Sequence, residues 1–107
     1  MAGSVGLIAV LEEAAAALED AEPAEDATTG AVTWSIGGLL FATVVRDRAE
    51  FRLDPAVVAA ALRTPDTSRS GRGADWVAFA PAELDRHAID RATAWLASSW
   101  RRADGES

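Results

Sequence analysis

The chain has 107 residues, no cysteine and a formal net charge of −7, and half of its residues are hydrophobic. A chain of this length forms one domain, and its hydrophobic content is too high for general disorder. Without cysteine it has no disulfide, thiolate metal site or cysteine nucleophile. Its longest apolar runs, residues 14–18 and 36–45, are too short to span a membrane. The first residues lack a positively charged stretch, so we expect no secretory signal and a cytoplasmic location.

The negative charge is confined to the N-terminal part of the sequence. Residues 1–30 contain seven acidic side chains and no basic one. Residues 31–107 contain ten acidic and ten basic side chains, and every base is an arginine. The predicted body of the domain is therefore electrically neutral, and the acidic segment would repel phosphate groups.

Residues 1–21 predict an acidic amphipathic helix that belongs to the single domain. Ser4 is a suitable N-cap, and the helix is expected over residues 5–21. Its apolar residues recur at helical spacing and form one stripe: Leu7, Ile8, Leu11, Ala14, Ala15 and Leu18. Pro23 ends the helix, and residues 22–30 are expected to form a mobile linker.

The next segment has the two-residue period of β-strands. Val32, Trp34 and Ile36 alternate with smaller or polar residues, and Gly37-Gly38 predicts a two-residue hairpin turn. Residues 39–46 form the second expected strand and residues 50–53 the third, with a turn at 46–49. Together these strands predict an antiparallel meander.

The C-terminal half predicts two helices and one more strand. Asp54-Pro55 is a helix start, and a short helix is expected over residues 56–63. Residues 64–74 form a polar, arginine-bearing loop, and residues 75–80 a strand with apolar residues on both faces. Pro81 opens a last helix that extends to about Arg102, and residues 104–107 are expected to be disordered.

The order of these elements predicts an α+β fold. It comprises the N-terminal helix, the three-stranded meander, the short helix, the fourth strand and the C-terminal helix, with the helices packed on a four-stranded sheet.

Several segments resemble the MmcQ/YjbR-like family of small bacterial proteins. Residues 34–42 (WSIGGLLFA) are similar to the family's aromatic-x-aliphatic-Gly-Gly-x-x-Phe-Ala hairpin. Residues 51–55, 75–77 and 98–101 then resemble later family segments in the same order, and the likeness covers residues 31–103. The resemblance implies the α+β fold and a DNA-binding label, but no catalytic residue. Leu39 stands where the family usually has Lys or Arg after the glycine pair.

The arginines are one candidate interface for nucleic acid or another anion. On the meander and near the 64–74 loop the candidates are Arg46, Arg48, Arg63, Arg69 and Arg72, to which Arg52, Arg101 and Arg102 could add. The loop's glycines and arginines could hold an anion, but the loop lacks the spacing of a phosphate-binding motif. Neighbouring acids such as Asp47 and Asp66 offer ion pairs instead, and a basic excess is absent. Nucleic acid is therefore the disfavoured alternative.

The tryptophans are a second candidate. Trp34, Trp76 and Trp95 either pack in the core or line a ligand pocket between sheet and helix. Trp95 favours the core because it lies on the core-facing stripe of the last predicted helix. That stripe comprises Leu84, Ala88, Ala92, Trp95, Leu96 and Ser99. Trp100 lies near the helix end.

The sequence offers no catalytic constellation, cofactor motif or metal-ligand cluster. His87 is the only histidine, with Glu83 and Asp90 nearby on one helix, and a surface position is favoured over acid–base catalysis. We therefore expect a non-catalytic binding domain without a cofactor. Its partner is expected to be another protein or a second copy of the chain; the alternatives are nucleic acid and a small molecule. The 22–30 linker would allow the N-terminal helix to exchange between copies.

Overall fold

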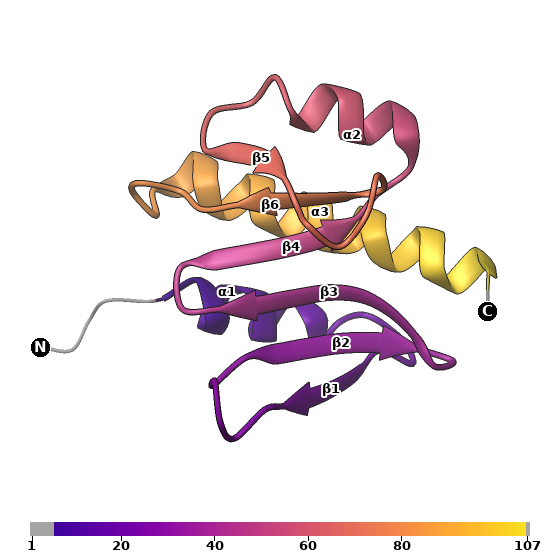
Figure 1. Cartoon of the computed structure of the whole chain (residues 1–107). Helices are drawn as coiled ribbons and strands as arrows, with labels where there is room; N and C mark the ends of the chain where they lie inside the picture. The colour runs from indigo at the N-terminus through magenta and orange to yellow at the C-terminus, as the bar shows by residue number, and fades with distance from the viewer. Residues whose placement is uncertain (1–5, 107) are drawn as a thin grey trace, which may run out of the picture.

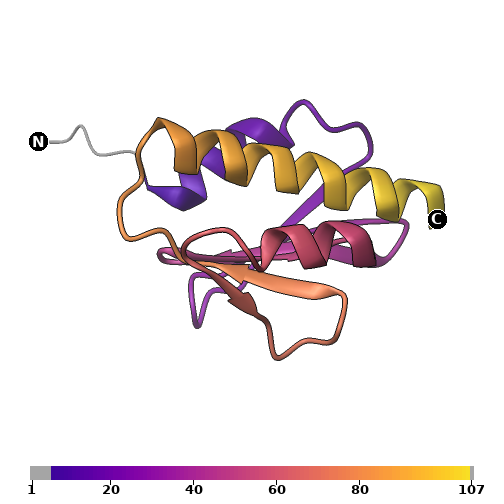
Figure 2. The same cartoon turned by 90° about the horizontal axis from the view of Figure 1, so that it is seen from above.

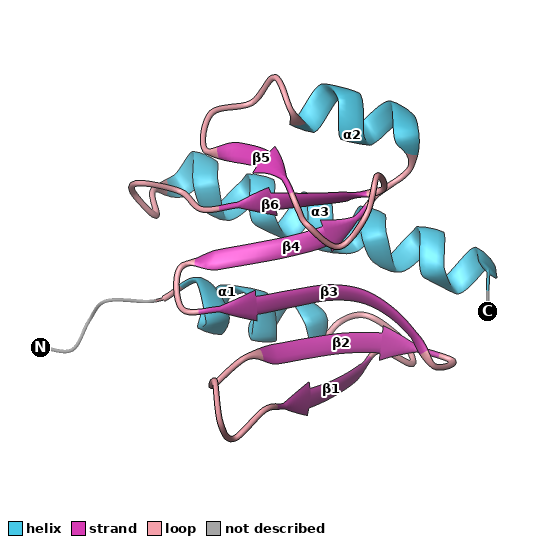
Figure 3. Cartoon of the chain, viewed as in Figure 1, coloured by secondary structure: helices cyan, strands magenta, loops and turns pink. Residues whose placement is uncertain are grey.

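The computed structural model describes residues 6–106. This part of the chain forms one six-stranded antiparallel sheet with the strand order β1-β2-β3-β4-β6-β5. Three helices accompany it (Figure 1; Figure 3 colours the elements by type). In chain order the elements are α1 (Leu7–Ala15), β1 (Glu22–Glu25), β2 (Val32–Ile36), β3 (Leu39–Val45), β4 (Arg48–Arg52), α2 (Pro55–Ala61), β5 (Thr67–Arg69), β6 (Trp76–Phe79) and α3 (Arg86–Glu106).

Helices α1 and α3 lie on the same face of the sheet and leave the opposite face open (Figure 2). α2 lies beside the β5 edge (Figure 1) and adds Val58 and Ala61 to the core. The predicted α+β class is thus confirmed, as is the packing of helices on an antiparallel sheet.

The core lies between the sheet and the α1–α3 layer. Leu11 of α1 and Leu96 of α3 are fully buried, and Phe51 and Phe79 of the sheet are equally inaccessible. The Trp95 ring meets the Phe79 ring edge-on, with 5.3 Å between centroids, and lies 6.2 Å from that of Phe51. Such tilted aromatic contacts stabilise a core beyond the area they bury.

The predicted hairpin is confirmed. Gly37 and Gly38 have φ of 56° and 83°, and a two-residue turn with two positive φ angles favours glycine at both positions. A register shift between Trp34 and Ser35 follows in the ladder with β3. The two glycines therefore form the turn between β2 and β3, as the sequence predicts.

The sheet has six strands rather than the four that the sequence predicts. The two additional strands lie at the edges of the sheet, in segments that were expected to be irregular. β1 occupies the start of the expected 22–30 linker, and β5 lies inside the expected 64–74 loop. After β1 the chain turns sharply: the Asp26 carboxylate accepts the Thr28 N–H at 2.8 Å, and Gly30 has φ of 76°. Both strands are short and largely exposed, so main-chain pairing forms them without an alternating apolar pattern.

The first helix is shorter than predicted. α1 starts after Gly6 and stops at Ala15, and the Leu18 N–H bonds to the Ala15 carbonyl three residues back. Asp20, in the turn that follows, has a positive φ of 63° and is therefore not helical, although the predicted helix includes it. Acidic residues at a helix C-terminus oppose its dipole, which accounts for the early end. The predicted Ser4 N-cap lies outside the described residues.

The last helix starts later and ends later than predicted. It begins at Arg86 rather than near Pro81, and residues 104–106, expected to be disordered, continue the helix. Ala103 is fully buried, and Glu106 pairs with Arg52 at 2.6 Å. Packing and this ion pair hold the last turn against the sheet. Ser107 lies outside the described residues.

Candidate functional site

A hollow of about 270 Å³ lies between the end of α1 and the β1 edge of the sheet. Trp34 lies at its bottom, because this residue lines the hollow and yet is only 2% exposed. Apart from Trp34 the hollow is lined by Glu12, Ala15, Ala16, Leu18, Ala21 and Pro23. We call it the Trp34 hollow. Its lining is apolar except for Glu12.

Local structure explains why this hollow exists. α1 stops at Ala15, so the chain leaves the helix layer before it covers the outer strands. Pro23 of β1 lies directly opposite Trp34 of β2, and opposite residues in antiparallel strands project to the same face. The rings of Trp34 and Pro23 are therefore neighbours at the base of the hollow. The turn after α1 contributes only the small side chains of Ala16 and Ala21 and that of Leu18.

Helix α3 fixes the turn that borders the hollow. The Trp100 indole Nε1–H donates a hydrogen bond to the Glu19 carbonyl oxygen at 2.9 Å. Leu18 and Ala21, on either side of the turn, are joined by a main-chain hydrogen bond of 3.3 Å. Trp100 therefore acts as a positioning residue for the hollow, although it does not line it.

The surroundings of the Trp34 hollow are acidic. Glu12 lines it, and Glu19 and Asp20 are exposed in the turn between Leu18 and Ala21. Among the residues that line the hollow none is basic, and residues 6–30 contain no base. An acidic side chain thus lines this apolar depression, and two more lie in the turn that borders it.

A second hollow, of about 420 Å³, lies between the two helices. It is lined by Val10, Glu13 and Ala14 of α1 and by Ile89 and Thr93 of α3. Its lining comes from the helix layer alone. No residue lines both this hollow and the Trp34 hollow.

On the opposite face of the sheet, Glu50 gathers three polar side chains. The Ser70 hydroxyl and the Arg72 Nε–H donate hydrogen bonds to its two carboxylate oxygens, the latter at 2.9 Å. Arg48 lies 3.5 Å away as an ion pair. Phe51 contacts Trp95 on the helix side, so the neighbouring Glu50 side chain belongs to the open face.

This cluster shifts the pKa of Glu50. Burial raises the pKa of the carboxyl, but the hydrogen bonds from Ser70 and Arg72 lower it, as do the charges of Arg72 and Arg48. The net result is a pKa below the ordinary value. Glu50 is therefore ionised at neutral pH and forms ion pairs with two of the candidate arginines, Arg48 and Arg72.

The same cluster fastens the loop between β5 and β6. In Figure 1 this loop crosses in front of β4 and β6, on the face opposite α1 and α3. The Arg72 guanidinium lies 5.5 Å above the ring centre of Trp76, a cation–π contact. The loop crosses part of the open face (Figure 1), and Ala78 of β6, which lies opposite Glu50 in the sheet, is buried.

Two of the five candidate arginines share a partner, and the other three lie on separate elements. Arg48 and Arg72 are joined through Glu50. Arg46 lies in the β3–β4 turn with φ of 54°, Arg63 follows α2, and Arg69 ends β5. All five of these arginines are exposed.

The three candidate tryptophans also lie in separate places. Trp34 forms the bottom of the Trp34 hollow, and Trp95 packs in the core against Phe51 and Phe79. Trp76 lies under Arg72 on the open face. Neither Trp76 nor Trp95 lines either hollow, so the structure does not assemble a common tryptophan pocket from these residues.

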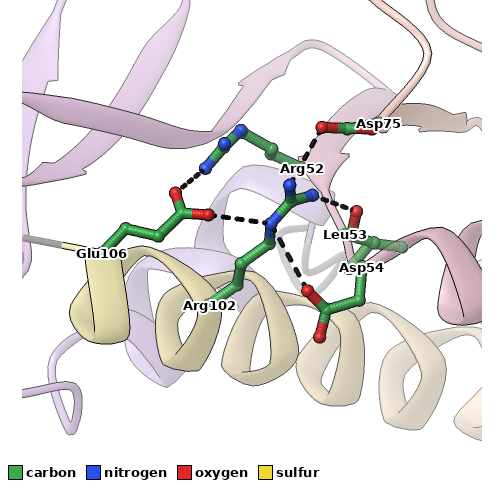
Figure 4. A network of polar contacts seen from close by, with 6 residues as sticks. All are labelled: Arg52, Leu53, Asp54, Asp75, Arg102 and Glu106. Atoms are coloured by element: carbon green, nitrogen blue, oxygen red, sulfur yellow. Dashed lines mark hydrogen bonds and ion pairs between the residues drawn. The ribbon is translucent and has the colours of Figure 1, made fainter.

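Arg102 is the centre of a separate polar network, drawn in Figure 4. Its guanidinium donates to the Leu53 carbonyl and, at 2.9 Å, to the Asp75 carboxylate. It also pairs with Asp54 at 3.4 Å and Glu106 at 3.3 Å. Burial lowers the pKa of Arg102, but Asp75 and Glu106 raise it, and the net direction is upward. The network ties the end of α3 to the ends of β4 and β6.

The remaining arginine and histidine candidates lie on the surface of α3 or in ion pairs. Arg52 pairs with Glu106. The hydrogen bond from Arg52 lowers the pKa of Glu106 most; desolvation opposes this, and the charge of Arg52 and the hydrogen bond and charge of Arg102 lower the pKa further. Arg101 is exposed, and so is His87. In the part of the chain that the structure describes, no group of three or more His, Cys, Asp or Glu residues could hold a metal ion.

Residues 6–106 include no helix with both the length and the apolar character needed to cross a bilayer. A scan against protein-family models finds no match to the chain, and a search of curated proteins finds none either.

Sequence reasoning missed the residues that organise both faces of the molecule. Glu50 and Ser70 are twenty positions apart, and no local pattern links them. Glu12 and Trp100 lie on predicted helices but outside their apolar stripes, and the helical pattern predicts neither the hollow nor its support. The hollow could have been predicted only from the pairing of Pro23 with Trp34 on neighbouring strands. The sequence does not predict β1, the strand that contains Pro23.

Proposed function

We propose that this protein is a non-catalytic binding domain that recognises a protein partner at the Trp34 hollow. The observation that carries the proposal is an apolar depression of about 270 Å³ over Trp34, with acidic surroundings. An apolar depression within a charged rim is the arrangement that interfaces use for an anchoring side chain.

Size favours a side chain over a free small molecule. Pockets that enclose drug-sized ligands usually measure roughly 300–1,000 Å³ and bury most of the ligand. The Trp34 hollow lies below this range and is bordered on one side by an exposed turn. It is suited to a protruding side chain whose main chain remains outside.

Charge favours a different protein over a second copy. Two copies that met through this surface would bring like charges together, because residues 1–30 contain only acidic charged side chains. Strand β1 in addition carries a proline and two glutamates, which discourage pairing of this edge with another strand. The same charges disfavour nucleic acid at this end of the molecule.

The proposal is tested by selecting random displayed peptides on the full chain. Enriched peptides should shift the NMR signals of the Trp34 indole and the Ala15 amide. The variant Ala16→Phe narrows the hollow, and Ala17→Phe is the matched control, because Ala17 is an exposed neighbour that does not line it. Loss of binding with Ala16→Phe alone supports the proposal. Failure to enrich any peptide, or equal binding to both variants, overturns it.

Membership of the MmcQ/YjbR-like family stays a prediction that rests on residues 34–42 and the later matching segments. The absence of catalysis is likewise part of the proposal. It is supported by the lack of a nucleophile–base pair in the sequence.

A further inference from the structure

We propose that the partner presents a basic segment in which one aliphatic side chain is flanked by Lys or Arg. This inference rests on the proposed function and specifies the chemistry of the ligand. The aliphatic side chain enters the Trp34 hollow, and the flanking cations face the acids around it. The two requirements come from different observations.

The aliphatic side chain is required by the lining. Leu18, Ala21 and Pro23 present carbon atoms, and the buried Trp34 closes the bottom. A polar group in this place would lose water without gaining a partner, which is unfavourable. A leucine-sized side chain instead removes apolar surface from water on both sides.

The cations are required by the charges. Glu12 lies on the α1 side of the hollow, and Glu25 lies on β1 two residues from Pro23, on the same side of that strand. An acidic or uncharged segment would gain no attraction here, and an acidic one would be repelled. Basic side chains placed on either side of the anchor complement both acids.

Helix α1 provides a sharp internal control. Glu12 and Glu13 are adjacent and exposed, but Glu12 lines the Trp34 hollow whereas Glu13 lines the hollow between α1 and α3. Glu12→Lys and Glu13→Lys change the net charge equally. A peptide held in the Trp34 hollow must distinguish the two variants, whereas one attracted by overall charge will not.

The experiment uses three synthetic peptides and the full chain. The first has a central leucine between lysines, the second replaces the lysines by glutamates, and the third replaces the leucine by alanine. Binding is followed by NMR shifts at Ala15, Ala16 and the Trp34 indole. We expect binding of the first peptide, no measurable binding of the second, and about tenfold weaker binding of the third. Added salt should weaken binding of the first peptide.

The variants complete the test. Glu12→Lys should weaken binding of the lysine–leucine peptide at least about tenfold more than Glu13→Lys, since only the first charge is adjacent to the bound segment. Equal losses would overturn the inference. Equal or stronger binding of the glutamate peptide at Trp34 would also overturn it, while leaving the proposed protein-binding function intact. If selection on random peptides yields no ligand at all, both the proposed function and this inference fail.

Discussion

The Arg72 Nε lies 2.9 Å from a carboxylate oxygen of Glu50, twenty-two residues earlier in the chain. This contact and the hydrogen bond from Ser70 hold the β5–β6 loop against the open face of the sheet. A segment that reads as a flexible arginine-bearing loop is thus bound to the domain by a carboxylate from a neighbouring strand. The arginine that was offered to an external anion is already occupied by an internal one.

Glu50→Gln should lower the free energy of unfolding at neutral pH by about 1–2 kcal/mol, because it weakens charge-assisted hydrogen bonds. The pKa of Glu50 is below its ordinary value of 4.5 in the folded protein. Its extra stabilisation is fully present above that value and disappears as the pH falls through the lower folded pKa. Urea unfolding of both proteins from neutral to acidic pH measures this difference. A difference that does not shrink on acidification would contradict the assignment.

Arg102→Lys should destabilise the fold by about 2 kcal/mol. A lysine ammonium cannot reach Leu53, Asp75 and Glu106 with the geometry of a planar guanidinium. Arg101→Lys is the matched control, because Arg101 is exposed, and its effect should be close to zero. Chemical denaturation provides the comparison. Equal effects of the two substitutions would show that the network in Figure 4 does not stabilise the end of α3.

Trp100→Phe should loosen the turn that borders the Trp34 hollow. Phenylalanine keeps an aromatic ring on α3 but has no N–H to donate to the Glu19 carbonyl, a loss of about 1 kcal/mol. In NMR spectra the amides of Leu18 and Ala21 should shift, and affinity for a peptide bound at the hollow should fall. Unchanged signals from this turn would show that Trp100 does not position it.

Duplex DNA should not bind the protein measurably even at low salt. Glu50 pairs with Arg48 and Arg72, and Glu106 pairs with Arg52, while residues 31–107 carry no excess of basic over acidic side chains and residues 1–30 carry only acids. Fluorescence anisotropy with a labelled duplex tests this directly. Binding that weakens steeply with added salt would favour the nucleic-acid alternative over protein recognition.

The sequence by itself determined the elements whose side chains are patterned. The alternation in residues 32–36, the Gly37-Gly38 turn and the apolar stripe that includes Ala88, Ala92 and Leu96 predicted two strands and a helix that the structure contains. These signals are local, because burial of one face imposes a fixed period on the residues that form it. They were sufficient for the α+β class.

Only the tertiary structure decided the edges of the sheet and the candidate site. β1 and β5 are formed by main-chain hydrogen bonds to strands already present, and such pairing leaves little pattern in the side chains. The Trp34 hollow depends on β1, because it needs Pro23 beside Trp34 and an α1 that stops short. The sequence located the negative charge in residues 1–30, but only the fold placed one of its acids, Glu12, in the lining of an apolar depression.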